Sequence, residues 1–274
     1  MKNSVSQHSE QNPASEAALS MKQDSPWTEG DISIRNGNCN VLLIAPHGHS
    51  KNDEKTYDIT RLAADELDCY AIVTKTYRKP FKKKGSNERR SPDKAKKWID
   101  LNRKDQVQEY LGSEFEKPLR NIADEIIETA GKALVIWIHG IGDDNLPAAK
   151  PKTKDADVNT VIGIGQGSPD HLTAHKKTVN RMISVLETNP LNPIKAVLAK
   201  RGSNYCGWHN NIMNQYFRTE GYSLSKVESI QMEIGKNGFR EAGNFQNTAM
   251  ALANSLIGLA RRSNTESDPW IKKS

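Results

Sequence analysis

The stretch NVLLIAPHGHSKNDEKTYDIT, residues 40–60, decides how the rest of the chain is interpreted. Its apolar part, Val41–Ala45, is the short continuous run expected of a strand covered on both faces of a sheet. The run ends directly on the sequence PHGH, Pro46–His49, and three carboxylates follow: Asp53, Glu54 and Asp58. Imidazoles and carboxylates gathered at the exit of a buried strand are costly to desolvate. They are also the side chains that bind a metal ion.

Similar apolar runs recur along the chain and alternate with helical patterns. The further strands that we predict are Tyr70–Thr74, Ala133–Ile138, Thr160–Ile164, Ala196–Ala199 and Val227–Ile234. Apolar residues at helical spacing predict helices over Thr56–Leu67, Lys104–Ala130 (broken near Gly112 or Pro118), His171–Glu187 and Arg240–Arg262. Strands that alternate with helices predict an α/β fold, with three α/β/α layers around a mainly parallel or mixed central sheet.

The chain has 274 residues, which is enough for one large α/β domain, and we place that domain at residues 31–265. Residues 1–30 are rich in Ser, Gln, Asn and Glu and predict a poorly ordered arm. Two long polar connections, residues 78–97 and 143–159, each follow a predicted strand. Long loops in a compact domain are often functional, and ligand sites of open α/β sheets gather at the carboxyl ends of strands.

Composition narrows the class of protein. The three cysteines show no paired spacing, which favours a reducing compartment and a cytoplasmic location. We expect no membrane partner, because no apolar run is long enough to span a bilayer and the first residues lack an apolar signal segment. The net charge of +6 comes largely from the basic stretch 77–98. That stretch interleaves few aromatic residues, which argues against a nucleic-acid partner.

A second predicted strand also ends in His-Gly, at His139 and Gly140 in ALVIWIHGIGDDN. Two such strands could place His47 and His139 on the same rim of the sheet. With a third ligand from Asp53, Glu54 or Asp58, they would form a His₂-carboxylate zinc site with a position open for water. We expect Gly48 and its counterpart after His139 to let the backbone turn sharply beside the metal.

Polar residues elsewhere supply the other parts of a hydrolytic site. Glu233 lies among apolar neighbours in VESIQMEI and is the candidate general base, with a salt bridge to Lys236 or Arg240 as the structural alternative. Asn102 and Arg103 in WIDLNRKDQ are candidates for holding a substrate carboxylate, because a guanidinium grips a carboxylate in bidentate fashion. Arg240 could bind an anion in the same way.

The motifs APHGH…DEKTYD, DLNR, VIWIHG and QMEI…FRE, in this order, resemble the N-formylglutamate amidohydrolase family. They also resemble the related poly-γ-glutamate hydrolases of the zinc-carboxypeptidase-like superfamily, over about residues 40–260. The resemblance implies a phosphorylase/hydrolase-like fold and one Zn²⁺ per chain. It implies metal ligands at His47 and His139, and a catalytic glutamate at Glu233.

The same resemblance implies substrate-carboxylate binding by Asn102 and Arg103, and it leaves the acidic metal ligand open. The superfamily's tighter His-x-x-Glu spacing would place that ligand at position 50, which is a serine here. The looser spacing selects Asp53, which we favour, and an alignment on the later aspartate selects Glu54. The implied activity is hydrolysis of an amide bond in a small anionic acyl-amino acid or peptide-like substrate.

Two other functions fit parts of the sequence. A non-catalytic protein that binds a polyanion or nucleic acid would use the basic stretch, and a metal-dependent phosphoesterase would use the same histidines. Further stretches that could line a pocket are GIGQGSPDHL, with Gln166, Asp170 and His171, and RGSNYCGWHNN, with Asn204, Tyr205, Cys206, Trp208 and His209.

Overall fold

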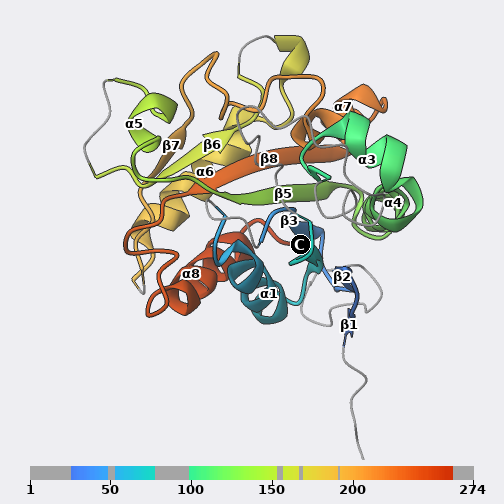
Figure 1. Cartoon of the computed structure of the whole chain (residues 1–274), viewed down its shortest axis with the longest axis horizontal. Coiled ribbons are helices and arrows are strands. Elements are labelled where there is room, and N and C mark those ends of the chain that lie inside the picture. Colours follow the sequence, from blue (N-terminus) through green and yellow to red (C-terminus); the bar gives the residue numbers. More distant parts are fainter. Residues whose placement is uncertain are drawn as a thin grey trace, which may run out of the picture.

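The computed structural model describes residues 26–48, 53–77, 99–152, 157–166, 169–190 and 192–261. Its centre is an eight-stranded sheet in the order β1-β2-β4-β3-β5-β8-β6-β7. The strands are β1 (Trp27–Thr28), β2 (Ile32–Arg35), β3 (Val41–Ala45), β4 (Tyr70–Thr74), β5 (Ala133–Gly140), β6 (Thr160–Gly163), β7 (Ala196–Leu198) and β8 (Val227–Ile234). Figure 1 shows this sheet between helices on both sides.

The sheet is mixed, and its central strands are parallel. β4, β3, β5 and β8 run in the same direction, while the β1–β2, β2–β4 and β6–β8 pairs are antiparallel. The α/β fold with a mixed sheet is therefore confirmed. The carboxyl ends of β3, β5 and β8 meet at one edge of the sheet, because parallel neighbours end at the same side.

Helices cover both faces of the sheet. The helical segments are α1 (Thr56–Leu67), α3 (Lys104–Tyr110), the π-helical η2 (Gly112–Glu116), α4 (Lys117–Ala130), α5 (Leu146–Ala149), η3 (Pro169–His171), α6 (Lys176–Thr188), η4 (Met213–Gln215), α7 (Tyr216–Thr219) and α8 (Phe245–Ile257). One apolar core packs α1, α6 and α8 against one face. A second packs α3, α4 and α7 against the other, as Figure 1 shows. The three expected layers are present.

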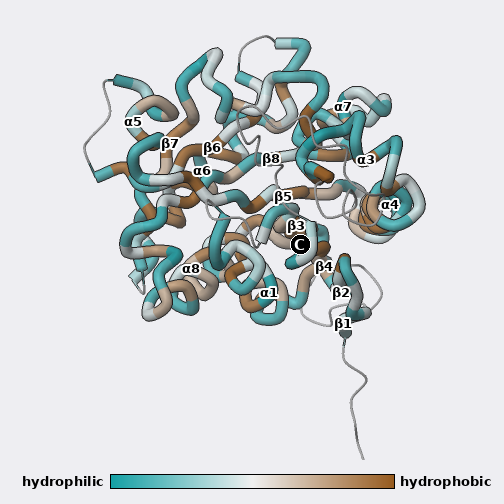
Figure 2. The backbone as a smooth tube through the Cα atoms, in the orientation of Figure 1, coloured by the Kyte–Doolittle hydropathy of each residue, from teal (hydrophilic) through white to brown (hydrophobic). Residues whose placement is uncertain are grey.

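Alternation along the strands assigns side chains to these two cores. In β5, Ile136 and Ile138 face the α1/α8 side, whereas Val135 and Trp137 face the α3/α4 side. Every residue of β5 is buried, which explains its continuous apolar sequence. Figure 2 shows apolar residues concentrated along the strands and the inner faces of the helices.

The helix predicted over residues 104–130 is broken near Gly112, which is one of the two alternative positions that the sequence indicated. α3 ends at Tyr110, Leu111 has a non-helical backbone, and the π-helical turn begins at Gly112. α4 then runs to Ala130 and ends on Gly131, whose φ of 78° is the left-handed conformation typical of a glycine helix end. The predictions for α6 and α8 begin too early, since these helices start at Lys176 and Phe245.

The strands β1 and β2, which lie at one end of the sheet order, were not predicted. β2 is short and buries only alternate residues, so it carries a weak apolar signal. Arg35 at its end is buried, and it binds Asp65 and Asp68 at 3.0 Å each. Trp27 and Thr28 pair with β2, inside the range 1–30 expected to be a poorly ordered arm. Residues 1–25 lie outside the described residues.

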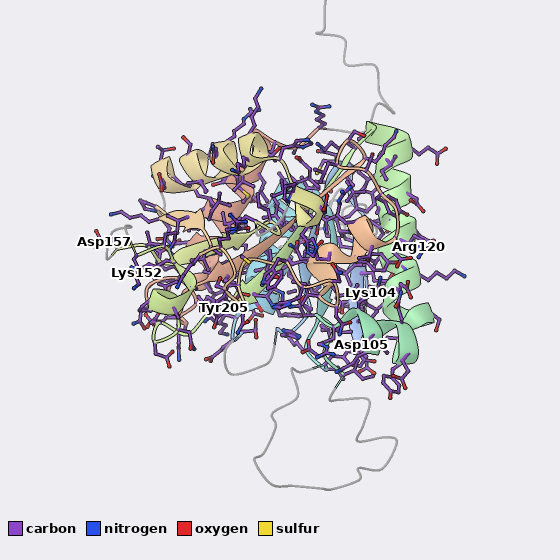
Figure 3. All side chains as sticks on the ribbon, turned by 90° about the horizontal axis from the view of Figure 1, so that it is seen from above. Lys104, Asp105, Arg120, Lys152, Asp157 and Tyr205 are labelled. Carbon is purple, nitrogen blue, oxygen red and sulfur yellow. The ribbon has the colours of Figure 1, made fainter. Side chains whose placement is uncertain are left out.

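Charged side chains tie the outer helices together at the surface. Lys104 of α3 and Arg120 of α4 both bind Glu220, which follows α7, at 3.1 Å each; Figure 3 labels both cations on the same side of the molecule. The three cysteines are buried free thiols, as expected. None of the helices in the described parts is both long and apolar enough to cross a bilayer.

Candidate metal centre and active site

Three of the predicted metal ligands meet at the carboxyl edge of the sheet. His47 follows β3, His139 is the penultimate residue of β5, and Asp53 lies between β3 and α1. One possible ligand atom from each lies within 4.8 Å of those of the other two, and all three residues are buried. The two predicted His-Gly strand exits are thus neighbours because β3 and β5 are adjacent parallel strands.

The spacing of these atoms suits a small divalent cation. Asp53 Oδ1 lies 3.5 Å from His139 Nδ1, and Asp53 Oδ2 lies 3.8 Å from His47 Nδ1. These separations are too long for strong hydrogen bonds. A tetrahedral zinc ion with bonds of about 2.0–2.2 Å would hold its ligand atoms roughly 3.3–3.6 Å apart. His139 Nε2 is also buried without a hydrogen-bond partner among the described residues. The donor set can therefore hold a divalent metal ion, and its atoms lie close to the spacing of a zinc site.

Asp100 orients the first histidine, and sequence reasoning did not single it out. Its Oδ1 lies 2.7 Å from His47 Nε2 in a buried contact and also accepts the backbone N–H of Asn102 at 3.0 Å. A carboxylate on the far nitrogen of a metal-binding imidazole sets its tautomer and directs the other nitrogen to the ion. The only signal in the sequence was the acidic position inside the quoted DLNR motif.

Of the two glycines after the histidines, Gly48 lies in a turn as expected, whereas Gly140 does not. A Cβ at Gly48 would lie 2.3 Å from Tyr57 Cβ and 2.9 Å from the carbonyl oxygen of Thr74, so close packing requires glycine there. Gly140 continues β5 as its last residue, which corrects the expected turn. Its N–H donates to Asp53 Oδ1 at 2.8 Å and helps to fix that carboxylate.

Glu233 lies beside this cluster on the neighbouring strand. It pairs with His139 in the parallel β5–β8 register, and such partners share a face of the sheet about 4.8 Å apart. Glu233 is buried, and Gln231 Nε2 donates to its Oε1 at 2.7 Å. The structure thus gathers two imidazoles, the Asp53 and Asp100 carboxylates and Glu233 at one buried edge.

The negative charges at this edge act on His139. Burial opposes its imidazolium form, but hydrogen bonding to Asp53 and the charges of Glu233, Asp53 and Asp100 outweigh that effect. Together they hold the pKa of His139 above its ordinary value. The same excess of carboxylates attracts a divalent cation, because the ion would compensate charges that are costly to bury alone.

The other two acidic candidates lie away from the cluster. The Glu54 side chain is 56% exposed, and its carboxylate lies 3.8 Å from Lys236 Nζ. Asp58 pairs with Lys55 at 3.3 Å near the start of α1. The geometry therefore favours Asp53 as the acidic ligand. His49 lies outside the described residues.

The predicted carboxylate-binding pair lies on the loop that carries Asp100. Asn102 is partly buried, and its Oδ1 has no hydrogen-bond partner among the described residues. The Arg103 side chain is 45% exposed and forms a bidentate pair with Asp105, at 2.7 and 3.2 Å. Its guanidinium is accessible to an incoming anion, which would have to displace Asp105.

Arg240 is engaged differently from the anion-binding role considered for it. It is 2% exposed, and its guanidinium donates to the carbonyl oxygens of Ile234, Gly235, Glu54 and Ile141 at 2.8–3.2 Å. These contacts join the ends of β8 and β5 to the loop that carries Asp53. The arrangement favours a positioning role for Arg240 over direct contact with a substrate.

The remaining pocket candidates divide into structural and accessible groups. Gln166 bonds the backbone at Ile164, Ile162 and Ala199, so its side chain is a structural bridge. Burial raises the pKa of the Cys206 thiol, which disfavours a nucleophilic thiolate. The pKa of Tyr205 is raised, first by burial and then by the negative charge of Glu233. The Tyr205 hydroxyl therefore interacts electrostatically with the candidate base.

The aromatic side chains after Cys206 form a compact group. The Trp208 and His209 rings lie 4.4 Å apart, and the Trp208 carbonyl contacts His171 Nδ1 at 2.6 Å. His171 belongs to the short helix η3, and the position before α6 is His175. Asp170 lies in the same short helix η3. The Asn204 side chain is exposed.

Comparison with solved structures finds similar chains among proteins of the kind that the motifs resemble. Structural neighbours include an N-formylglutamate amidohydrolase from Ralstonia eutropha JMP134, with TM-score 0.49 and 13% identity over 86% of this chain and 96% of that chain. A bacteriophage poly-γ-glutamate hydrolase has TM-score 0.42 and 13% identity, over 86% and 90% of the two chains. A succinylglutamate desuccinylase from Silicibacter sp. TM1040 has TM-score 0.38 and 14% identity, over 89% and 68%.

No protein-family model and no curated protein matches the sequence. At 13–14% identity and TM-scores below 0.5, the likeness to these solved structures is one of fold alone.

Proposed function

We propose that this chain is a zinc-dependent amidohydrolase that cleaves an amide bond in a small anionic acyl-amino acid or peptide-like substrate. The observation that carries the proposal is the buried group of His47, Asp53 and His139, with Glu233 paired to His139 on the adjacent strand. Two imidazoles and one carboxylate leave a ligand position open, which is the arrangement of catalytic zinc sites.

His47, Asp53 and His139 would hold the ion. Zinc in such a site supplies a Lewis acid that lowers the pKa of water toward 7 and polarises a carbonyl group. Asp100 keeps the His47 ring in one orientation through its contact with Nε2. The Gly140 N–H fixes Asp53 through a hydrogen bond to Oδ1. Both ligands are thus preorganised by groups outside the donor set.

Glu233 is the proposed general base. It would take a proton from the attacking water and later deliver that proton to the leaving amine. Glu233 is buried, so its carboxylate is shielded from bulk water. Gln231 Nε2 donates a hydrogen bond to its Oε1 at 2.7 Å, which helps to hold the carboxylate in place. The position on β8 places the base beside His139 rather than among the proposed ligands.

Asn102 and Arg103 are the proposed anchor for a substrate carboxylate. The Asn102 and Asp100 positions share one loop, so a substrate held there would lie next to the carboxylate that supports His47. Arg103 would exchange its exposed contact with Asp105 for the substrate. This anchor is the reason for proposing an acyl-amino acid or peptide-like anion rather than a neutral amide. The three free thiols fit a cytoplasmic enzyme.

The metal is tested by elemental mass spectrometry of purified wild type, His47→Ala and His139→Ala. His209→Ala is the matched control, because that imidazole is exposed and outside the cluster. About one zinc per chain is expected in the wild type and the control, with loss from both cluster variants. A wild type that binds no metal, even after zinc is added, would overturn the proposal.

The reaction is tested with zinc-loaded protein on N-acyl amino acids, γ-glutamyl peptides and phosphate monoesters. Amide hydrolysis should fall by roughly 10²–10⁴ in Glu233→Gln while zinc content is unchanged. Glu54→Gln, an exposed carboxylate away from the cluster, should retain activity. Turnover of phosphate monoesters alone would assign the site to a phosphoesterase. Zinc-independent binding of polyanions without turnover would favour the non-catalytic alternative.

A further inference from the structure

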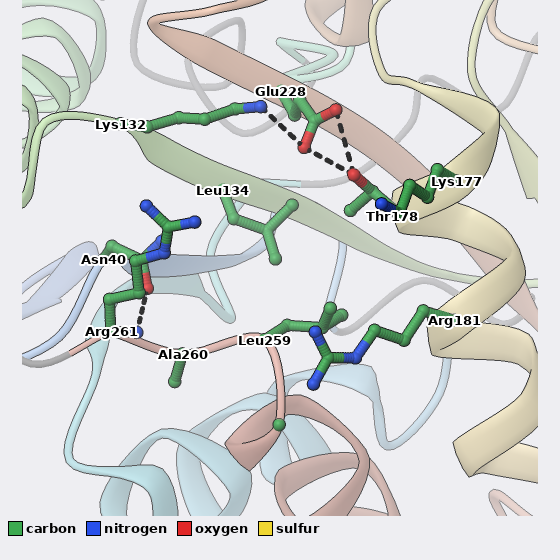
Figure 4. A pocket seen from close by; sticks show the side chains of 11 residues that line it. Asn40, Lys132, Leu134, Lys177, Thr178, Arg181, Glu228, Leu259, Ala260 and Arg261 are labelled. Atoms are coloured by element: carbon green, nitrogen blue, oxygen red, sulfur yellow. Dashed lines mark hydrogen bonds and ion pairs between the residues drawn. The ribbon is translucent and has the colours of Figure 1, made fainter. Parts of the chain in front are cut away.

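A second polar pocket lies at the opposite edge of the sheet, where β5 and β8 begin. It has a volume of about 310 Å³ and lies between the strand starts, α6 and the residues after α8. Its lining includes four basic side chains and one acidic side chain: Lys132, Lys177, Arg181, Arg261 and Glu228. Figure 4 shows these residues together. Pockets of about this size and above commonly hold small molecules.

The acidic residue is already compensated. Glu228 is 3% exposed; it accepts hydrogen bonds from the N–H of His175 at 2.8 Å and from Thr178 Oγ1 at 2.9 Å. Lys132 Nζ lies 3.1 Å from its carboxylate, as Figure 4 shows. Glu228 therefore holds Lys132 and neutralises one of the four cations.

The other three cations have no carboxylate partner in the part of the chain that the structure describes. Lys177 and Arg181 project from consecutive turns of α6, and Arg261 follows α8. The backbone at Arg261 is held in place, because its N–H donates to Asn40 Oδ1 at 2.5 Å and its carbonyl oxygen accepts the Asn40 N–H at 2.9 Å. All three side chains are exposed, so a ligand can reach them.

Part of the pocket lining is apolar. Leu134 of β5, together with Leu259 and Ala260, lines it between the basic groups. Basic side chains without a carboxylate partner, next to apolar side chains, suit an anion that has a carbon skeleton. The skeleton would cover the apolar side chains, while the anionic groups would bind the basic ones.

We propose that this pocket is a binding site for a small organic anion that bears at least two carboxylate or phosphate groups. Two such groups can engage Lys177 and Arg181 on one side and Arg261 on the other. The site is separate from the candidate metal centre, since the seven residue steps from Lys132, just before β5, to His139 near its end span roughly 23 Å. The inference does not depend on the proposed amidohydrolase activity.

The test is isothermal titration calorimetry of the full chain at constant ionic strength, with tricarballylate and fructose 1,6-bisphosphate as probes. The variant is Lys177→Gln combined with Arg181→Gln. The matched control is Lys176→Gln, an exposed lysine of the same helix that does not line the pocket. His139→Ala is titrated in parallel to separate this pocket from the metal centre.

Saturable binding of at least one probe, with a stoichiometry of one, is expected in the wild type, Lys176→Gln and His139→Ala. The dissociation constant should rise at least about tenfold in the double variant, because two of three cations are lost. The proposal is overturned by any of three results: neither probe binds, the double variant binds as tightly as the control, or binding disappears in His139→Ala.

Discussion

His47 Nε2 and Asp100 Oδ1 lie 2.7 Å apart in a buried contact that joins residues 53 positions apart in the sequence. The contact occupies the nitrogen that points away from Asp53, whose Oδ2 lies 3.8 Å from Nδ1 on the other side of the ring. One carboxylate therefore orients the imidazole while a second approaches its free nitrogen. This arrangement gives the candidate metal centre a built geometry before any ion binds.

Replacing Asp100 with Asn should weaken zinc binding by roughly 10–100-fold, because His47 loses the carboxylate that fixes its tautomer and orientation. The measurement is a competition titration against a chromophoric zinc chelator. Asp105→Asn is the matched control, since that carboxylate lies on the adjacent helix turn, is exposed and pairs with Arg103. Equal affinities in Asp100→Asn and the control would contradict a positioning role.

Asp53 and Glu54 are adjacent acidic residues, one buried and one exposed, and their variants should differ in zinc content. Asp53→Asn removes the charge between the two imidazoles and should abolish stoichiometric zinc binding. Glu54→Gln alters a side chain that is 56% exposed and should leave zinc content unchanged. Zinc per chain by elemental mass spectrometry decides between them, and loss in Glu54→Gln alone would reassign the ligand.

Arg240→Met should lower the free energy of unfolding by about 2–4 kcal/mol, because four carbonyl contacts, three of them buried, lose their donors. Arg120→Met is the comparison, since the Arg120 side chain is 44% exposed and its loss should change stability by about 1 kcal/mol or less. Urea unfolding followed by circular dichroism measures both. A stable Arg240→Met protein with a raised KM would instead favour substrate binding by Arg240.

Gly48→Ala should destabilise the protein by about 1–3 kcal/mol, because the added methyl group meets Tyr57 and the Thr74 carbonyl in a packed site. Gly243→Ala has no atom within 4 Å of the added Cβ and serves as the control. Midpoints of urea unfolding report the difference. Equal stabilities of Gly48→Ala and Gly243→Ala would show that the loop after β3 accommodates the added methyl group without strain.

The central strands were predictable because a strand that is buried on both faces has a continuous apolar sequence. Val41–Ala45, Tyr70–Thr74 and Val227–Ile234 were predicted with the bounds that the structure has. β2 was missed because only alternate residues are buried. The starts of α6 and α8 were misplaced, since helix patterns extend smoothly into neighbouring turns and neither helix has a side-chain cap hydrogen bond at its start.

By itself, the sequence determined the α/β class, the two His-Gly strand exits and the position of Glu233 on a buried strand. These features depend on local periodicity, which can be recognised in the sequence alone. Only the tertiary structure decided that Asp53 rather than Glu54 faces the imidazoles, that Asp100 supports His47, and that Arg240 binds backbone carbonyls. Those outcomes depend on which side chains from distant segments come into contact when the parallel strands pair. A local sequence pattern does not specify such contacts.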